Sequence, residues 1–304
     1  MSDGAGGTGG AAGGTAGGGG AVQAWTPLRL LAWTQGYFAR GGVDAPRLTA
    51  EILLAHVLVC DRVRLYLDFD KPLAEDELAA FRELVRRRAA GEPTAHLTGK
   101  KEFLGRSFRI DARALIPRPE TELVAEAALE ALPEGGAALD LGTGSGCIAV
   151  SLALGRPGAR VTAVELSPEA LEVARSNAAA LGAALELVAG DLYRPLPAER
   201  RFQVVVSNPP YVPSGDLPGL SREVRREPRL ALDGGPEGLD VLRRVVAGAP
   251  AHLVPGGTLV VEIHEGHGDA AVQLCLGAGF ASAELRRDFA GLPRYVVARL
   301  PAAP

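Results

Sequence analysis

The sequence predicts an α/β fold in which a mainly parallel, seven-stranded sheet follows a small helical bundle and a β-hairpin. Apolar residues recur at helical spacing between Trp25 and about Leu97. Residues 100–115 alternate between apolar and polar around Gly105, as hairpin strands do. From about residue 117, apolar runs of strand length alternate with helical patterns, which favours a sheet with helices on both faces.

The chain accordingly divides into four parts. Residues 1–24 are nearly all Gly, Ala, Thr and Ser, which predicts a disordered tail. Residues 25–97 carry three helical patterns and form the expected bundle, residues 98–116 form the hairpin linker, and residues 117–304 form the α/β domain. Within that domain we expect strands near residues 138–142, 160–165, 185–189, 203–207, 258–263, 281–286 and 295–300.

A glycine-rich turn follows the first expected strand of the α/β part. Residues 137–141 are a mainly apolar run, residues 142–146 read Gly-Thr-Gly-Ser-Gly, and a helical pattern begins at Cys147. Glycines permit close backbone approach to a ligand, and a helix start presents unpaired N–H groups, although such a turn can also serve packing alone. A dinucleotide fingerprint would place its third glycine at 147 rather than 146, so S-adenosylmethionine is favoured over NAD.

Acidic residues end the next two expected strands. Glu165 follows the apolar run 161–164 at about the spacing where an acidic residue meets ribose hydroxyls. Asp191 follows residues 187–190, and either a turn role or a hydrogen bond from an adenine amino group would explain it, the ligand role being favoured. Asp140, in contrast, is expected to stabilise the glycine turn.

The tetrapeptide Asn208-Pro209-Pro210-Tyr211 lies just past the apolar run 204–206. The two prolines restrict the loop, because each fixes its own φ and the first also restricts Asn208. Pro210 has no N–H, so the Pro209 carbonyl and the Asn208 side-chain oxygen remain as two acceptors for the hydrogens of an –NH₂ group. The pattern predicts methylation of a planar nitrogen, with Tyr211 packed over the amide plane or, alternatively, capping the sheet edge.

Two further segments extend this pattern: Gly-Glu-Pro-Thr-Ala-His-Leu-Thr-Gly at 91–99 and Ile-Pro-Arg-Pro-Glu-Thr-Glu at 116–122. Together with the turn and the tetrapeptide, they resemble the protein-(glutamine-N(5)) methyltransferases of the HemK/PrmC type, which modify peptide-chain release factors. The resemblance runs from about residue 25 to the C-terminus. Asn-Pro-Pro-Tyr alone is shared with methyltransferases of nucleic-acid bases, whereas the 116–122 segment and the helical N-terminal third look specific to the release-factor enzymes.

The resemblance implies a class I, Rossmann-like, S-adenosylmethionine-dependent methyltransferase domain and a helical bundle that recognises the substrate. Asn208, Pro209, Pro210 and Tyr211 would be catalytic and would hold the glutamine of a Gly-Gly-Gln tip, with Phe103 and Arg118 near the substrate mouth. The cofactor would be bound by Gly142, Thr143, Gly144, Ser145, Gly146, Glu165, Asp191, Leu192 and Asn208.

Two positions depart from the pattern of this family. Glu165 stands where relatives often carry Asp, which keeps the charge and adds one methylene. Leu192 stands where relatives can place a Trp against the adenine, so that aliphatic contact would replace stacking and adenine affinity would change.

Composition and charge limit the alternatives. A chain of 304 residues with 47% hydrophobic content can bury one large and one small core. The net charge of −4 disfavours a broad nucleic-acid footprint, and hence the alternative of an adenine N(6) methyltransferase. A second alternative, a non-catalytic S-adenosylmethionine-binding module, would not need an intact Asn-Pro-Pro-Tyr. Neither the scattered Cys60, Cys147 and Cys275 nor the His-Glu-Gly-His run at 264–267 has metal-ligand spacing, so no metal is expected.

No apolar run approaches the ~20 residues of a membrane span, and the N-terminus lacks the features of a signal peptide. We therefore expect a cytoplasmic monomer that acts on class I peptide chain release factors without direct nucleic-acid binding. The basic run Arg86 to Arg88 predicts either a solvated face or a surface that docks an acidic partner.

Overall fold

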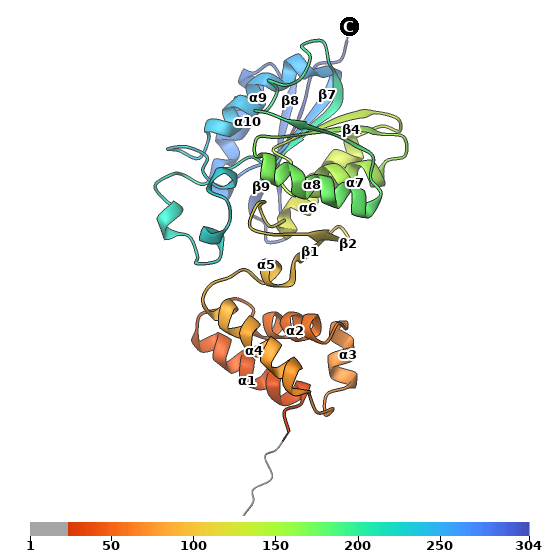
Figure 1. Cartoon of the computed structure of the whole chain (residues 1–304). Coiled ribbons are helices and arrows are strands. Elements are labelled where there is room, and N and C mark those ends of the chain that lie inside the picture. The colour runs from red at the N-terminus through yellow and green to blue at the C-terminus, as the bar shows by residue number, and fades with distance from the viewer. Residues whose placement is uncertain (1–23, 304) are drawn as a thin grey trace, which may run out of the picture.

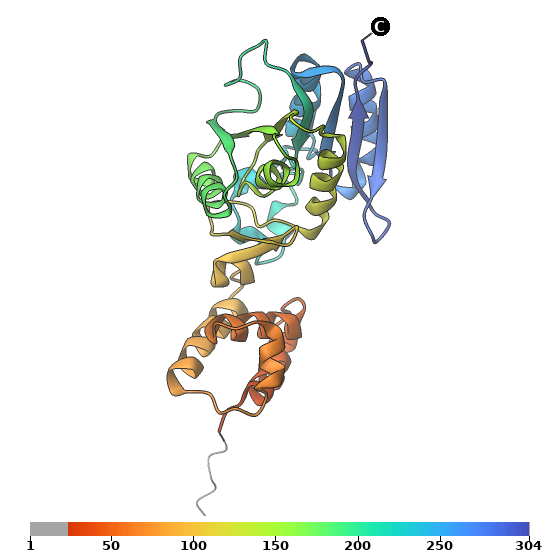
Figure 2. The same cartoon turned by 90° about the vertical axis from the view of Figure 1, so that its right-hand side faces the viewer.

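The computed structural model describes residues 24–303, so the predicted tail lies outside the described residues except for Ala24. A helical bundle stands at one end of these residues and a sheet flanked by helices at the other, with a short hairpin between them (Figure 1). The view turned by 90° shows the same separation and places the C-terminal strands at one side of the sheet (Figure 2). The predicted fold class is thus confirmed.

The bundle contains more helices than the three predicted patterns. These patterns correspond to α1, α2 and α4, whereas α3 and α5 were not predicted because helices of six and five residues are too short to show a period. Phe38 and Phe81 are among the fully buried side chains that pack the helices together. The bounds are α1 (Pro27–Arg40), α2 (Pro46–Val57), α3 (Arg62–Leu67), α4 (Glu75–Ala89) and α5 (Thr94–Thr98).

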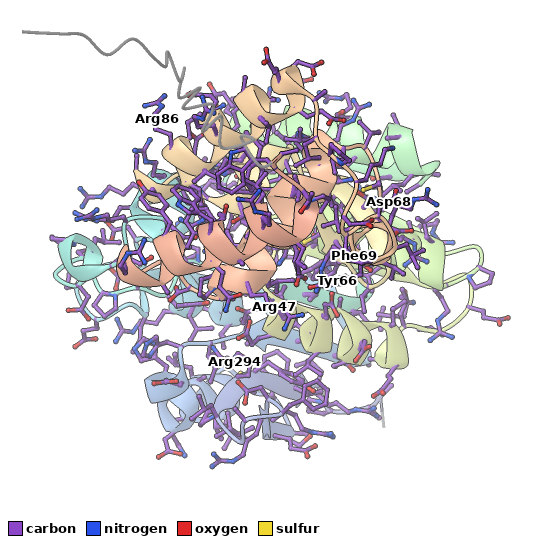
Figure 3. All side chains as sticks on the ribbon, turned by 90° about the horizontal axis from the view of Figure 1, so that it is seen from below. Arg47, Tyr66, Asp68, Phe69, Arg86 and Arg294 are labelled. Carbon is purple, nitrogen blue, oxygen red and sulfur yellow. The ribbon has the colours of Figure 1, made fainter. Side chains whose placement is uncertain are left out.

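A buried carboxylate ties α2 to α3. Glu51 is 2% exposed and accepts hydrogen bonds from Arg47 Nε and Arg62 Nε, each at 2.9 Å, and from the Tyr66 hydroxyl. Figure 3 shows Arg47 beside Tyr66 at this surface of the bundle. Burial raises the pKa of Glu51, but these hydrogen bonds outweigh burial and hold the pKa below its usual value. The carboxylate therefore remains charged and joins the two helices at neutral pH.

The predicted hairpin linker is formed by β1 (Lys100–Phe103) and β2 (Arg106–Arg109), which pair antiparallel. Leu104 and Gly105, between the strands, have φ of 45° and 69°, as the two-residue turns that match strand twist require. Phe103 and Phe108 contact each other edge to face at 6.1 Å and join the core beneath α6 (Pro119–Ala131). The hairpin is therefore anchored to the α/β part of the chain.

The sheet has seven strands in the order β5-β4-β3-β6-β7-β9-β8, as predicted in number and mainly parallel character. Of the seven, β9 alone runs opposite to the other strands, so its pairs with β7 and β8 are antiparallel. The strand expected near residues 258–263 begins earlier, at Leu253, and its pairing with β6 contains a register shift between Phe202 and Val204. The bounds are β3 (Ala137–Leu141), β4 (Arg160–Glu165), β5 (Leu185–Ala189), β6 (Phe202–Ser207), β7 (Leu253–Glu262), β8 (Ser282–Arg287) and β9 (Pro293–Arg299).

Helices cover both faces of the sheet, and each face has its own core. Val204 and Val206 pack towards α6, α7 (Cys147–Gly155) and α8 (Pro168–Leu181), whereas Val205 packs towards α9 (Asp240–His252) and α10 (Gly268–Gly277). This alternation has the two-residue period of a strand, and burial on both sides explains why β6 is apolar almost throughout. The strand order reverses between β3 and β6, where ligands bind in open α/β sheets.

The long loop between β6 and α9, residues 208–239 and here called the excursion, contacts the bundle. It contains the short turns η1 (Leu217–Gly219), η2 (Val224–Arg226) and η3 (Arg229–Ala231). Arg88 of α4, only 2% exposed, forms an ion pair with Glu223, and Arg226 donates to the Ala90 carbonyl at 3.2 Å. These contacts connect the recognition bundle expected from the sequence with the segment that follows the tetrapeptide.

The same contacts bear on the two interpretations of the basic run. Arg86 pairs with Glu83 and Arg87 pairs with Glu92, while Arg88 is buried against the excursion. Arg86 is exposed and Arg87 half-buried, as a solvated face requires, whereas Arg88 departs from it, and docking of an acidic partner stays untested. In the described part of the chain, none of the helices combines the length and apolar character needed to cross a bilayer.

Candidate active site

The glycine turn joins β3 to α7 and has a closed side and an open side. Gly146 has φ of 82°, and a Cβ there would lie 3.1 Å from the Ala174 Cβ of α8, so only glycine fits. A Cβ on Gly142 or Gly144 would meet no atom within 4 Å. These two glycines therefore face open space, into which a ligand can approach the backbone.

Asp140 holds the turn, as predicted. It is fully buried, and its Oδ2 accepts from the Thr143 hydroxyl at 2.6 Å and from the Ala149 N–H at 3.2 Å. Burial raises the pKa of Asp140 to about 7, although both hydrogen bonds act in the opposite direction. Thr143 is thus turned inwards to Asp140 and supports the turn.

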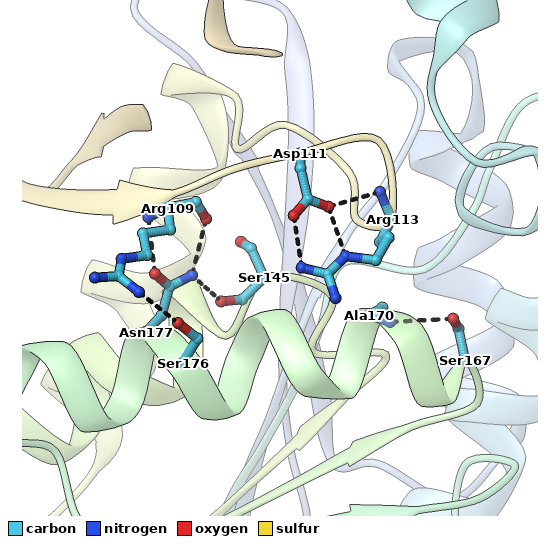
Figure 4. A network of polar contacts seen from close by, with 8 residues as sticks. All are labelled: Arg109, Asp111, Arg113, Ser145, Ser167, Ala170, Ser176 and Asn177. Atoms are coloured by element: carbon cyan, nitrogen blue, oxygen red, sulfur yellow. Dashed lines mark hydrogen bonds and ion pairs between the residues drawn. The ribbon is translucent and has the colours of Figure 1, made fainter. Parts of the chain in front are cut away.

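Asn177, which the sequence analysis missed, fastens three segments together (Figure 4). From α8 its Oδ1 accepts from the Arg109 N–H at 2.7 Å, and its Nδ2 donates to the Arg109 carbonyl at 3.0 Å and the Ser145 carbonyl at 2.9 Å. The hairpin, α8 and the glycine turn therefore share one buried side chain. The only signal in the sequence is an amide on the otherwise apolar face of a helix.

Replacing Asn177 should destabilise the protein strongly. Asn177→Ala leaves three buried or half-buried backbone groups without partners, which we expect to lower the free energy of unfolding by about 2–4 kcal/mol. Urea denaturation measures this change. Ser176→Ala, which removes one partly exposed contact with Arg109, is the matched control and should cost at most ~0.5 kcal/mol. Equal stabilities of the two variants would contradict the role of Asn177.

Glu165 ends β4 beside the turn. Its Oε2 accepts from the Gly144 N–H at 2.8 Å and its Oε1 from the Ser167 N–H at 2.9 Å. These two bonds fix the carboxylate at the wall of a cavity, here called the glycine-turn cavity. Among its lining residues are Gly142, Gly144, Glu165, Asp191, Leu192, Asn208, Pro209, Pro210 and Arg244.

The predicted ligand positions do not all reach this cavity. Thr143, Ser145 and Gly146 are not among its lining residues, because they bind Asp140, bind Asn177 and pack on Ala174. In the structure these three hold the turn in place, and their direct contact with the cofactor stays a prediction.

Asp191 and Leu192 line the glycine-turn cavity after β5. Both carboxylate oxygens of Asp191 accept from Arg244 Nη2, at 2.7 and 2.6 Å, so this cation of α9 lies beside the expected adenine position. Leu192 has φ of 52°, a left-handed conformation that costs a non-glycine residue of order 1 kcal/mol or more. Arg244 was not predicted, since a single arginine on a helix carries no motif.

The tetrapeptide lies where two cavities meet. Asn208 and Pro209 line the glycine-turn cavity and also a second one, here called the tyrosine cavity, which is lined as well by Tyr211, Arg118 and Val224. Pro209 is buried, and Asn208 is partly buried at the end of β6. The loop therefore stands between a cavity with a glycine-lined wall and a cavity with an aromatic wall.

Comparison with known proteins decides the family. Residues 29–99 match the model of the PrmC N-terminal domain, and residues 120–218 match that of the methyltransferase small domain. A curated release factor glutamine methyltransferase of Geobacter sulfurreducens is 46% identical over 91% of this chain and 98% of its own length. The chain belongs to the release factor glutamine methyltransferase family.

Other relatives agree with this family. The release factor glutamine methyltransferase of Chlorobaculum tepidum is 44% identical over 90% of this chain and 96% of its own length. A solved methyltransferase from Pyrococcus furiosus, 21% identical, covers 66% of this chain and 91% of its own, with a TM-score of 0.51. That likeness concerns the fold, and it agrees with the class I methyltransferase architecture of the family.

Two positions that the family resemblance placed near the substrate, Arg118 and Phe103, lie in different surroundings. Arg118 lines the tyrosine cavity and forms an ion pair with the buried Glu227, whose other oxygen accepts from the Ile116 N–H at 2.9 Å. Glu227, which the sequence analysis missed, thereby joins the linker to the excursion. Phe103 is 1% exposed, packs on Phe108 and lines neither cavity, so the structure shows a packing role, and its place near the substrate mouth stays a prediction.

Proposed function

We propose that this protein transfers the methyl group of S-adenosyl-L-methionine to the side-chain N(5) of the glutamine in the Gly-Gly-Gln motif of class I peptide chain release factors. One observation carries the proposal: Asn208 and Pro209 line both cavities. A methyl donor in the glycine-turn cavity and an amide in the tyrosine cavity would therefore meet at the two acceptors of the tetrapeptide. Family membership supports the same reaction.

The glycine-turn cavity suits S-adenosylmethionine. Gly142 and Gly144 leave room beside the backbone, and the Glu165 carboxylate is fixed where it can accept from ribose hydroxyls. Leu192 and the Asp191–Arg244 pair form the part of the wall that suits an adenine. When bound, the cofactor supplies a methyl carbon whose bond to positively charged sulfur breaks, with both electrons staying on sulfur, as its bond to nitrogen forms.

The protein's task is to position a weak nucleophile. The lone pair of an amide nitrogen is delocalised into the carbonyl, so the nitrogen must be held and polarised. Asn208 Oδ1 and the Pro209 carbonyl each accept one amide hydrogen, which draws electron density onto the nitrogen and orients it towards the donor. The proton leaves the nitrogen for solvent after the methyl group has arrived, when the nitrogen is cationic, so no general base is needed in the cavity.

The substrate reaches this site past the excursion and the linker. Arg118 and Val224 line the tyrosine cavity, and the excursion that carries Val224 is joined to α4 through Glu223. A release factor that contacts the bundle would thus also contact the segment bordering the cavity. This arrangement supports the bundle as the recognition domain.

Incubation with isotope-labelled S-adenosylmethionine tests the proposal. We expect label on the Gly-Gly-Gln peptide of a release factor, located on glutamine by mass spectrometry, and none on duplex DNA. Label on adenine instead would favour the nucleic-acid alternative. Cofactor binding without transfer to either acceptor would favour a non-catalytic module.

A further inference from the structure

A buried carboxylate lies behind the tetrapeptide. Glu262, at the end of β7, is 1% exposed, and its Oε1 accepts from the Tyr211 hydroxyl at 3.2 Å. Its Oε2 is buried and has no direct hydrogen bond among the described residues. Glu262 lines neither cavity, so it does not contact a ligand there. A buried charged group with a free lone pair requires an explanation, because it is costly to keep.

Thr121 lies between this carboxylate and Asn208. It is 2% exposed in the first turn of α6, and its Oγ1 accepts from Asn208 Nδ2 at 3.2 Å. It also stabilises the charged form of Glu262. A hydroxyl has one hydrogen, and because Oγ1 accepts from Asn208, that hydrogen is free to point elsewhere. We assign the Glu262 carboxylate as the acceptor of that hydrogen, because Thr121 lowers the pKa of Glu262 and Oε2 has no other partner among the described residues.

We infer that Thr121 and Glu262 form a positioning relay that holds Asn208 with Nδ2 away from the substrate and Oδ1 towards it. The inference rests on the proposed function, in which Oδ1 accepts a hydrogen from the substrate amide. The side-chain amide of an asparagine has nearly the same shape after a half-turn, so shape alone does not select its orientation. A turned Asn208 would oppose its own N–H groups to those of the glutamine and lose the acceptor.

The charge of Glu262 determines whether Thr121 accepts from Asn208 or donates to it. A carboxylate only accepts, so it draws the Thr121 hydrogen and leaves Oγ1 to accept from Asn208. A neutral side chain at 262 can donate to Oγ1, which frees the Thr121 hydrogen to point at Asn208 and favours the turned amide. The Tyr211 hydroxyl, bound to the other carboxylate oxygen, keeps the aromatic residue in place on the same support.

The relay should depend on pH. Burial raises the pKa of Glu262 to about 7, while Thr121, the Tyr211 hydroxyl and Arg294 of β9 lower it and Glu120 of α6 raises it further. Above this pH the carboxylate is charged and accepts the Thr121 hydrogen, so that Thr121 Oγ1 accepts from Asn208. As the pH falls through about 7, protonation turns Glu262 into a donor, and the fraction of correctly oriented Asn208 falls with it.

Thr121→Val and Glu262→Gln test the inference, since both variants nearly keep the side-chain size. Thr121→Val removes the acceptor for Asn208, and Glu262→Gln removes the charge. We expect kcat to fall roughly 10-fold in each, with the KM for S-adenosylmethionine changed less than about 2-fold, because the orientation matters only for the reacting amide. Thr121→Ser, which keeps the hydroxyl, should restore most of kcat. In Glu262→Gln the decline of kcat below about pH 7 should disappear.

Several outcomes would overturn the relay. Wild-type kcat in Thr121→Val, or an equal loss in Thr121→Ser and Thr121→Val, would reduce Thr121 to a packing role. If the wild-type protein methylates the release factor and these variants do too at full rate, only the relay fails. If the wild type does not methylate it, the proposed function fails. The relay is then judged by NMR, because the Nδ2 hydrogens of Asn208 should exchange faster in Thr121→Val, and unchanged exchange would exclude the relay.

Discussion

Asn208→Ala should lower kcat by roughly 10²–10³, the loss seen when one placed polar partner of a reacting group is removed. The variant keeps the Pro209 carbonyl and so can accept a hydrogen bond from only one of the two amide hydrogens of the glutamine. The nitrogen is then less polarised and less well aimed. Because Asn208 lies in the loop after β6 and its side chain makes one hydrogen bond, to Thr121, we expect the unfolding free energy to change by only about 1 kcal/mol.

Single-turnover methylation of a release factor measures the chemical step, and thermal unfolding verifies the fold. Asn208→Asp is the matched control. It keeps an acceptor oxygen of the same size but cannot donate to Thr121, so its loss should be intermediate. Wild-type turnover of Asn208→Ala would remove Asn208 from the catalytic residues and end the mechanism proposed above.

Glu165→Ala should weaken S-adenosylmethionine binding by roughly 10- to 100-fold. A hydrogen bond to a charged group contributes about 1.5–3 kcal/mol, and the variant loses the carboxylate that accepts from the ribose hydroxyls. It also releases the N–H groups of Gly144 and Ser167, which the carboxylate holds at 2.8 and 2.9 Å. The glycine turn therefore loses part of its preorganisation as well.

Isothermal titration calorimetry with S-adenosylmethionine and with S-adenosylhomocysteine measures this effect. Both ligands carry the same ribose, so both should lose affinity to the same extent. Glu165→Asp, which keeps the charge on a side chain one methylene shorter, should lose less. If Glu165→Ala bound both ligands with wild-type affinity, the ribose would have to lie elsewhere in the cavity.

Much of the fold and part of the site could be predicted from local patterns. The strand-length runs, the glycine turn and Glu165 are features of consecutive residues, and carboxyl ends of parallel strands meet at one edge of a sheet. The predicted fold therefore places Gly142, Glu165 and Asn208 close together, and in the structure all three line one cavity. The hairpin was equally visible, since two strands of four residues with a tight turn between them require no distant partner.

Other site features depend on contacts between distant segments. Thr121 and Asn208 are 87 residues apart, Tyr211 and Glu262 are 51 apart, and Asn177 is 68 from Arg109. No local period records such pairs, because they exist only once helices pack on the sheet. Phe103 shows the converse: a family position expected at the substrate mouth is buried in the core because the hairpin folds onto α6.

The sequence by itself thus determined the fold class, the glycine turn and the stiff tetrapeptide that we propose binds an –NH₂ group, because backbone stiffness and residue chemistry act over a few consecutive positions. Only the tertiary structure decided which way Asn208 faces, what supports the turn, and that the two cavities meet at Pro209. Those features come from side chains brought together by packing, whose partners are set by the whole fold.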